Sequence, residues 1–241
     1  MILFITKMIL AHFIGDFYLQ PVTWVHDKEQ KKHKSIYLYL HSMIHGILVW
    51  VLLWEWNAWK IALTLAIVHF GVDLLKLVFQ EEKSKRNWFF IDQLLHIISI
   101  FILIDIYNNG GIPYNISQIL NSKIIIFVTG YVILTLPMSI IIQKVLMPWS
   151  DIIGEAEDDS LLNAGKWIGI LERSFVFIFI AANRWEAVGF LLAAKSVFRF
   201  GDLKESKDRK LTEYILLGTL FSFGIAIVMS MLVTNLANLI H

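Results

Sequence analysis

Residues 58–79 read AWKIALTLAIVHFGVDLLKLVF, an apolar run long enough to cross a lipid bilayer as one α-helix. Near its middle lies His69, and Asp73 follows four residues later. On an α-helix a four-residue step places both side chains on one face, about one turn apart. The run therefore predicts a membrane helix that presents two metal-type ligands on one side.

Three other apolar segments in the first hundred residues repeat this arrangement. Their pairs are His12/Asp16, His41/His45 and Asp92/His96. Five of the eight histidines of the chain lie in the four pairs. The spacing predicts four helices that direct their paired side chains into a common interior.

The composition agrees with a membrane protein. Hydrophobic residues make up 57% of the chain and charged residues only 17%, so lipid is the expected solvent and the principal partner. Cysteine is absent, which leaves nitrogen and oxygen as the only metal donors. The net charge of +1 argues against a nucleic-acid partner.

Eight apolar segments can be marked along the chain. They are residues 2–20, 36–54, 58–79, 88–107, 122–145, 161–183, 185–200 and 211–236. The predicted fold is an all-α bundle of eight transmembrane spans, or of seven if residues 185–200 lie on the membrane surface. The loop Asn108-Asn109-Gly110-Gly111-Ile112-Pro113 places a boundary between two halves, 1–110 and 111–241.

Loop charges predict the orientation. Basic residues gather after the first and third segments and before the last, at Lys28, Lys31, Lys32, Lys34, Lys83, Lys85, Arg86, Lys204, Lys207, Arg209 and Lys210. The positive-inside rule places these loops in the cytoplasm and both termini outside. All four pairs then lie at one depth, on the order of 6–15 Å inside the cytoplasmic boundary.

Eight ionisable side chains at one depth predict a metal centre. Any single pair could instead make an interhelical hydrogen bond or lie at the interface. However, intramembrane charges are costly, whereas a divalent cation stabilises ionised carboxylates. The expected ligands are His12, Asp16, His41, His45, His69, Asp73, Asp92 and His96. They suit one or two ions, with zinc the first expectation and iron or manganese the alternatives, and Asp16, Asp73 or Asp92 could serve as the catalytic base.

Other polar residues could assist this centre. Gln20 and Lys76 continue the faces of two pairs, and Gln93 is a further candidate for a supporting or substrate-binding residue, although it is expected to point elsewhere on its helix. In the second half, Glu172 and Arg173 are expected to form a buried salt bridge. Alternatively, Arg173, Lys195 and Arg199 form a clamp for a phosphate or carboxylate group.

The motifs of the first half resemble those of a bacterial membrane family known only as a domain of unknown function. They are Ala11-His12-x-x-x-Asp16-Phe17-x-Leu19-Gln20, His41-x-x-x-His45, His69-x-x-x-Asp73-x-x-Lys76 and Asp92-Gln93-x-x-His96. The segments Leu171-Glu172-Arg173 and Arg199-Phe200-x-Asp202-Leu203-Lys204 resemble the C-terminal part of that family. The resemblance implies a multi-pass protein of the bacterial inner membrane, without an activity. The first half is also similar in style to predicted inner-membrane metal-dependent hydrolases, but ligand spacing and order differ, so no catalytic role follows.

The leading hypothesis from the sequence is a membrane metalloenzyme, a hydrolase that acts at the cytoplasmic leaflet on a phosphate-bearing lipid. The alternatives are a transporter or sensor of divalent metal and a non-catalytic scaffold with a structural metal.

Overall fold

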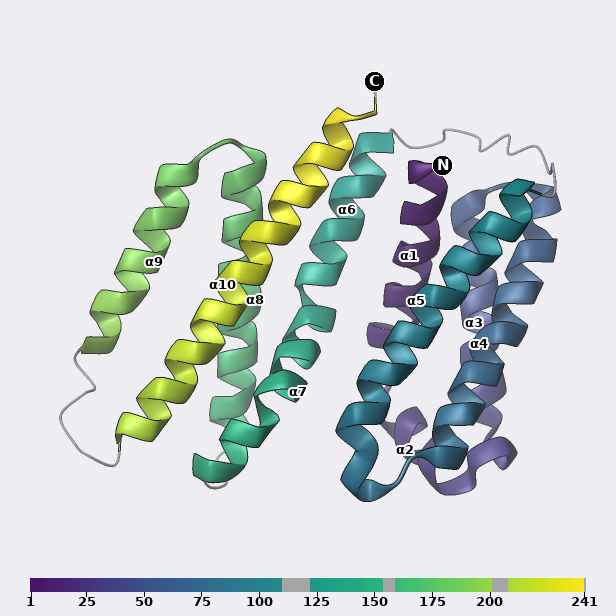
Figure 1. Ribbon diagram of the computed structural model, residues 1–241, viewed down its shortest axis with the longest axis horizontal. Coiled ribbons are helices and arrows are strands. Elements are labelled where there is room, and N and C mark those ends of the chain that lie inside the picture. The colour runs from purple at the N-terminus through teal and green to yellow at the C-terminus, as the bar shows by residue number, and fades with distance from the viewer. Residues whose placement is uncertain (110–121, 154–158, 201–207, 241) are drawn as a thin grey trace. The chain divides into compact units, whose positions relative to one another are not determined.

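The structure, a computed structural model, describes residues 1–109, 122–153, 159–200 and 208–240 (Figure 1). These residues form α-helices and short 3-10 helices, with no strand among them. The predicted all-α polytopic fold is therefore confirmed.

The chain divides into two compact units, Met1–Thr129 (unit 1) and Gly130–His241 (unit 2). The division lies inside one helix, α6 (Ser122–Leu134). The boundary predicted at residue 110 adjoins residues 110–121, which lie outside the described ranges.

Unit 1 is built mainly from four long helices and one short helix. They are α1 (Ile2–Phe17), α2 (Val22–Lys31), α3 (Ile36–Leu53), α4 (Trp59–Phe79) and α5 (Lys85–Asn109). Helices α3 and α4 pack closely, α1 packs against α3 and α5, and α5 packs against α4 (Figure 1). The four long helices therefore enclose a common interior, as the paired ligands require.

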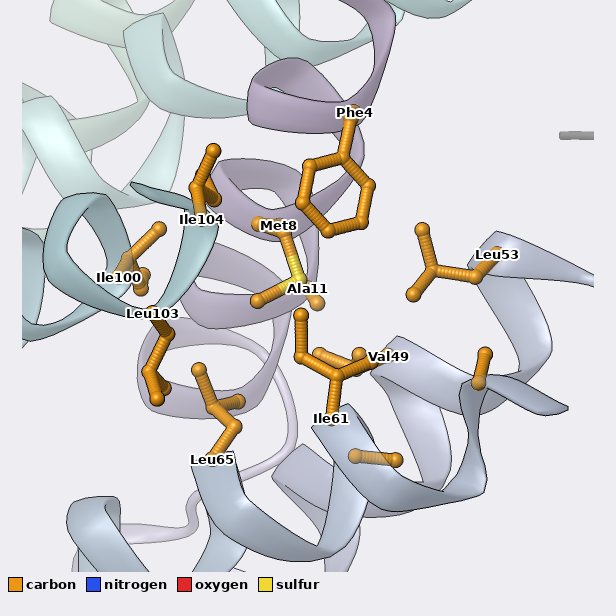
Figure 2. Close-up of a cluster of buried hydrophobic side chains, with 12 residues drawn as sticks. Phe4, Met8, Ala11, Val49, Leu53, Ile61, Leu65, Ile100, Leu103 and Ile104 are labelled. Carbon is orange, nitrogen blue, oxygen red and sulfur yellow. The ribbon is translucent and has the colours of Figure 1, made fainter. Parts of the chain in front are cut away.

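One end of this interior is filled by an apolar cluster (Figure 2). It consists of Phe4, Met8, Ala11, Val49, Leu53, Ala58, Ile61, Ala62, Leu65, Ile100, Leu103 and Ile104. These residues recur at three- and four-residue steps, which place them on the facing sides of α1, α3, α4 and α5. We call this set the apolar plug. Each long helix continues from the plug directly into its histidine or carboxylate pair.

The chain turns sharply between α1 and α2. The two helix axes meet at 81°, and Pro21, which has no N–H group, precedes the first residue of α2. Helix α2 is polar and buries only one of its residues, Lys28. It lies across the end of unit 1 that is opposite the apolar plug.

Unit 2 contains the end of α6 and four further helices. They are α7 (Leu136–Ile153), α8 (Asp159–Ala181), α9 (Trp185–Phe200) and α10 (Asp208–Asn238). Helix α10 packs against α8 and α7, and α9 packs against α8. Helices α6 and α7 are separated by a break at Thr135, two residues before Pro137.

The described helices supply five candidate membrane spans, or six if α1 and α2 form one bent span. The spans are Ile36–Leu53, Trp56–Phe79, Glu82–Asn108, Ser122–Trp149 and Glu213–Asn238. This number is smaller than the eight segments marked in the sequence. Helix α9 has only 16 residues, and α8 carries Lys166, Glu172 and Arg173 along its apolar stretch.

Exposed tryptophans surround the link between α3 and α4. Trp50, Trp54, Trp56 and Trp59 are all exposed there. Tryptophan is enriched where a membrane meets water. The link therefore marks one membrane boundary, with the apolar plug beneath it and the paired ligands deeper in unit 1.

Candidate metal centre

All eight paired side chains come together inside unit 1. Every one of these side chains is at most 9% exposed. Each of the five histidines turns its Nε2 atom toward a carboxylate or a neighbouring histidine. The geometry expected from the four-residue spacing is therefore present, and the role of these residues as metal ligands stays a prediction. We call the eight residues the His/Asp cluster.

Asp16 lies at the centre of one part of the cluster. Its Oδ1 atom is 3.1 Å from His41 Nε2 and 3.0 Å from His45 Nε2. The same oxygen is 3.5 Å from His69 Nε2. His41 Nε2 and His69 Nε2 are in turn only 3.1 Å apart. Three imidazole nitrogens from two helices thus surround one carboxylate oxygen from a third.

Asp73 and Asp92 meet at His96 in the other part. Asp73 Oδ1 is 3.4 Å from His96 Nε2 and 3.9 Å from His69 Nε2. Asp92 Oδ1 is 3.5 Å from His96 Nε2. Because His69 contacts both Asp16 and Asp73, the two parts form one continuous cluster.

Each carboxylate directs its second oxygen to a hydrogen-bond donor outside the cluster. The three bonds run from Gln93 Nε2 to Asp16 (2.8 Å), from Lys28 Nζ to Asp73 (2.7 Å) and from Lys76 Nζ to Asp92 (3.0 Å). Outer donors of this kind fix the orientation of metal-binding carboxylates and leave the inner oxygen for the ion. The cluster therefore has an inner set of donors and an outer set of supports.

Hydrogen bonds to Asp16 hold the Nε2 side of His41 and His45, whereas packing holds the other side of these rings among the described residues. The Nδ1 atoms of His41 and His45 are buried and have no hydrogen-bond partner. The His45 ring instead stacks on His69, with 3.6 Å between centroids. A Cβ atom on Gly15 of α1 would collide with the His45 ring. The absence of a side chain at Gly15 therefore makes the space that His45 occupies.

Three overlapping groups within the cluster have the spacing of metal ligands. Their donor atoms lie within 4.8 Å of one another, and the groups are His12/Asp16/His45/His69, His41/His69/Asp73 and Asp16/Asp92/His96. Asp92 Oδ1 is buried without a hydrogen-bond partner among the described residues, which is uncommon for a buried acceptor. The donors are all nitrogen and oxygen, so they fit zinc, iron or manganese.

The cluster is closed on the side of the apolar plug. At this junction the packing leaves no space for a water molecule between His12, Leu65, His69, His96, Ser99 and Ile100. The Ser99 hydroxyl donates to the backbone carbonyl of His96 (2.8 Å), and the remaining neighbours are apolar. Polar side chains border the cluster at the other end, which carries α2.

The structure corrects the prediction for Gln93 and adds Lys28. Gln93 does not point away from the site: its Oε1 is 3.3 Å from His12 Nε2, and its amide nitrogen donates to Asp16. The sequence places Lys28 only in a basic loop. In the structure it is 5% exposed and bonded to Asp73. Lys76 contacts Asp92 as a supporting residue. Gln20 has a buried amide nitrogen without a partner.

Glu172, Arg173 and Lys195 have partners within unit 2. Arg173 donates to the backbone carbonyls of Leu134 and Thr135, at 2.6 and 3.2 Å, and to the hydroxyls of Ser139 and Ser222. The expected Glu172–Arg173 salt bridge is not the one formed, because Glu172 pairs with Lys195 at 2.5 Å. The Arg199 side chain lies outside the described residues.

Comparison with known proteins identifies the family. No curated protein and no solved structure matches the chain. Residues 4–126 match a family described as "Protein of unknown function (DUF3307)". This match contains the whole His/Asp cluster, whereas the resemblance seen in the sequence extended into the second half as well. Because the match covers more than half of the sequence, the chain belongs to the DUF3307 family.

Proposed function

We propose that unit 1 holds a divalent metal centre and hydrolyses a membrane substrate at the end that carries α2. One observation carries the proposal: five imidazoles and three carboxylates from four helices converge in a buried cluster. The basic loops after α1 and α4 support a cytoplasmic position for this end, at the inner leaflet of a bacterial cytoplasmic membrane.

Electrostatics support an ion at this position. Three carboxylates within an apolar bundle carry a large desolvation cost, and two lysines offset only part of their charge. The outer oxygens bind the lysines and Gln93, so the inner oxygens remain for a cation. Zinc is the first candidate, because imidazole and carboxylate are its usual ligands outside cysteine-rich sites.

A divalent ion in such a centre supplies Lewis-acid chemistry, which polarises the scissile group and favours attack by water. Asp92 is the proposed general base, because its inner oxygen is the one carboxylate oxygen of the cluster without a hydrogen-bond partner. Asp16 and Asp73 remain as ligands, since histidines already approach their inner oxygens. Lys76 holds Asp92, and Gln93 holds Asp16.

Two other functions make different demands on the same cluster. Transport would need a polar path on both sides, but the apolar plug borders the cluster on one side. A purely structural metal is favoured by one observation, the nearly complete burial of all eight ligands. The enzyme needs an access route, which the 25% exposed side chain of Lys76 offers at the α2 end.

The test compares Asp92→Asn with Asp105→Asn, a control at an exposed carboxylate on the same helix. Full-length protein is purified in detergent, bound metal is quantified, and hydrolysis is measured on panels of phospholipids and phosphate esters. Wild type and the control should bind metal and turn over one substrate class. Asp92→Asn should keep most of the metal and lose at least ~100-fold in rate. Stoichiometric metal without turnover on any panel would favour the structural role.

A further inference from the structure

Two lysines, the buried Lys28 and the partly exposed Lys76, lie next to the His/Asp cluster. Within the described residues, Lys28 Nζ has one hydrogen-bond partner, Asp73, and Lys76 Nζ has one, Asp92. An ammonium group has three donors. Each lysine therefore keeps donor capacity beyond its carboxylate.

Both lysines serve the same edge of the cluster. Asp73 and Asp92 each approach Nε2 of His96, at 3.4 and 3.5 Å. The two ammonium groups are therefore bound to carboxylates that share one imidazole. They also lie at the end of unit 1 away from the apolar plug, where Lys76 is partly exposed.

Helix α2 is held where its Lys28 side chain reaches this edge of the cluster. Glu29, the next residue, accepts hydrogen bonds from Gln80 and Lys85, both at 3.0 Å. These bonds fix α2 to the end of α4 and the start of α5. Because Lys28 is the one buried residue of α2, the helix is built to insert a single cation.

The charge balance points to an anionic ligand. The three carboxylates and the two ammonium groups sum to one negative charge. One divalent ion changes the sum to one positive charge, and two ions change it to three. A metal-loaded cluster with two lysines at its edge therefore attracts an anion of high charge density.

We propose that Lys28 and Lys76 form an anion subsite that binds the phosphate group of the substrate beside the metal centre. The inference rests on the metal centre proposed above and assigns its substrate class. A phosphate has several strong acceptor oxygens, which two ammonium groups and a metal can share. The unit 2 clamp is not needed, since Arg173 and Lys195 are bonded to groups of unit 2.

The experiment measures metal content and phosphate binding separately, so that the two proposals can fail separately. Wild type, Lys28→Met, Lys76→Met and the control Lys31→Met are purified in phosphatidylcholine nanodiscs and loaded with zinc. Lys31 is on the same helix as Lys28, but its side chain is 59% exposed and pairs with Asp27. Equilibrium dialysis with labelled inorganic phosphate gives the affinity, and elemental analysis gives the metal.

We expect equal metal in all four proteins, and a loss of phosphate affinity of roughly tenfold or more in Lys28→Met and Lys76→Met only. Equal phosphate binding in all four, or none in metal-loaded wild type, overturns the anion subsite and leaves the metal centre intact. Loss of metal from the two lysine variants also overturns it, because the lysines then serve only the ligands. Absence of metal from wild type overturns both proposals.

A second arm identifies where the phosphate comes from. Phosphatidic acid is mixed into the nanodiscs and competes with labelled phosphate. Displacement that depends on Lys28 and Lys76 assigns the subsite to a lipid headgroup. Phosphate binding that the lipid does not displace assigns it to a soluble phosphate ester.

Discussion

The two units bury charge in opposite ways. In unit 2, Arg173 is 3% exposed, and two backbone carbonyls and two hydroxyls accept its hydrogen bonds. In unit 1, imidazole nitrogens face one another and face carboxylates, and Asp92 Oδ1 has no hydrogen-bond partner among the described residues. The protein itself satisfies the cation of unit 2, whereas the proposed metal centre gives the His/Asp cluster a cation that the chain does not supply. Under that proposal, one buried charge holds the fold and the other binds a ligand.

The strongest test of this difference is the loss of His69, which belongs to two of the three ligand groups. We expect His69→Ala to lower metal affinity at least ~100-fold, because both groups lose a donor. Elemental analysis and competition with a chelator measure the change. His26→Ala is the matched control, since His26 is exposed on α2. Equal metal in the two variants would mean that the cluster does not bind it.

Arg173→Met tests the other side of the comparison. The carbonyls of Leu134 and Thr135 lose their donor at the break between α6 and α7. We expect the free energy of unfolding to fall by about 1–3 kcal/mol, with metal content unchanged. Thermal unfolding in detergent measures the stability, and Arg184→Met, at an exposed position, provides the control. A loss of metal in Arg173→Met would contradict this separation, because it would mean that metal binding in unit 1 depends on Arg173 in unit 2.

Gly15→Ala tests how packing positions His45 within unit 1. The added Cβ collides with the His45 ring, so the imidazole must shift away from Asp16. We expect metal affinity to fall about tenfold, the effect of a small overpacking strain. Gly71→Ala is the control, because a Cβ at Gly71 on α4 meets no atom within 4 Å. If both variants bind metal like wild type, His45 is not held by the space at Gly15.

Much of the site could be predicted because helical periodicity alone fixes which side chains share a face. The helical period and the alternation of loop charge were enough to predict that the pairs of four helices lie at one depth in the membrane. The direction of the Gln93 side chain was predicted wrongly, because a residue adjacent to Asp92 points about a quarter-turn away on its helix. Helix α5 packs against both α4 and α1, so Asp92 meets Lys76 on one neighbour and Gln93 meets Asp16 on the other.

Lys28 could not be predicted from periodicity. It enters the site because the chain turns by 81° before α2, and because Glu29 attaches α2 to Gln80 and Lys85. In the sequence it is one of several lysines in a basic stretch, with no signal that separates it from Lys31. Likewise, the partners of Arg173 are backbone carbonyls, which no side-chain pattern reveals.

The order of the cluster along the chain has a consequence for biogenesis. Every ligand from His12 to His96 lies in unit 1, on helices that follow one another and pack as near neighbours. During synthesis these helices leave the ribosome before unit 2 is complete. If the cluster binds metal as proposed, capture of the ion would accompany insertion of the first helices, and the ion would serve as a template on which the nascent bundle closes.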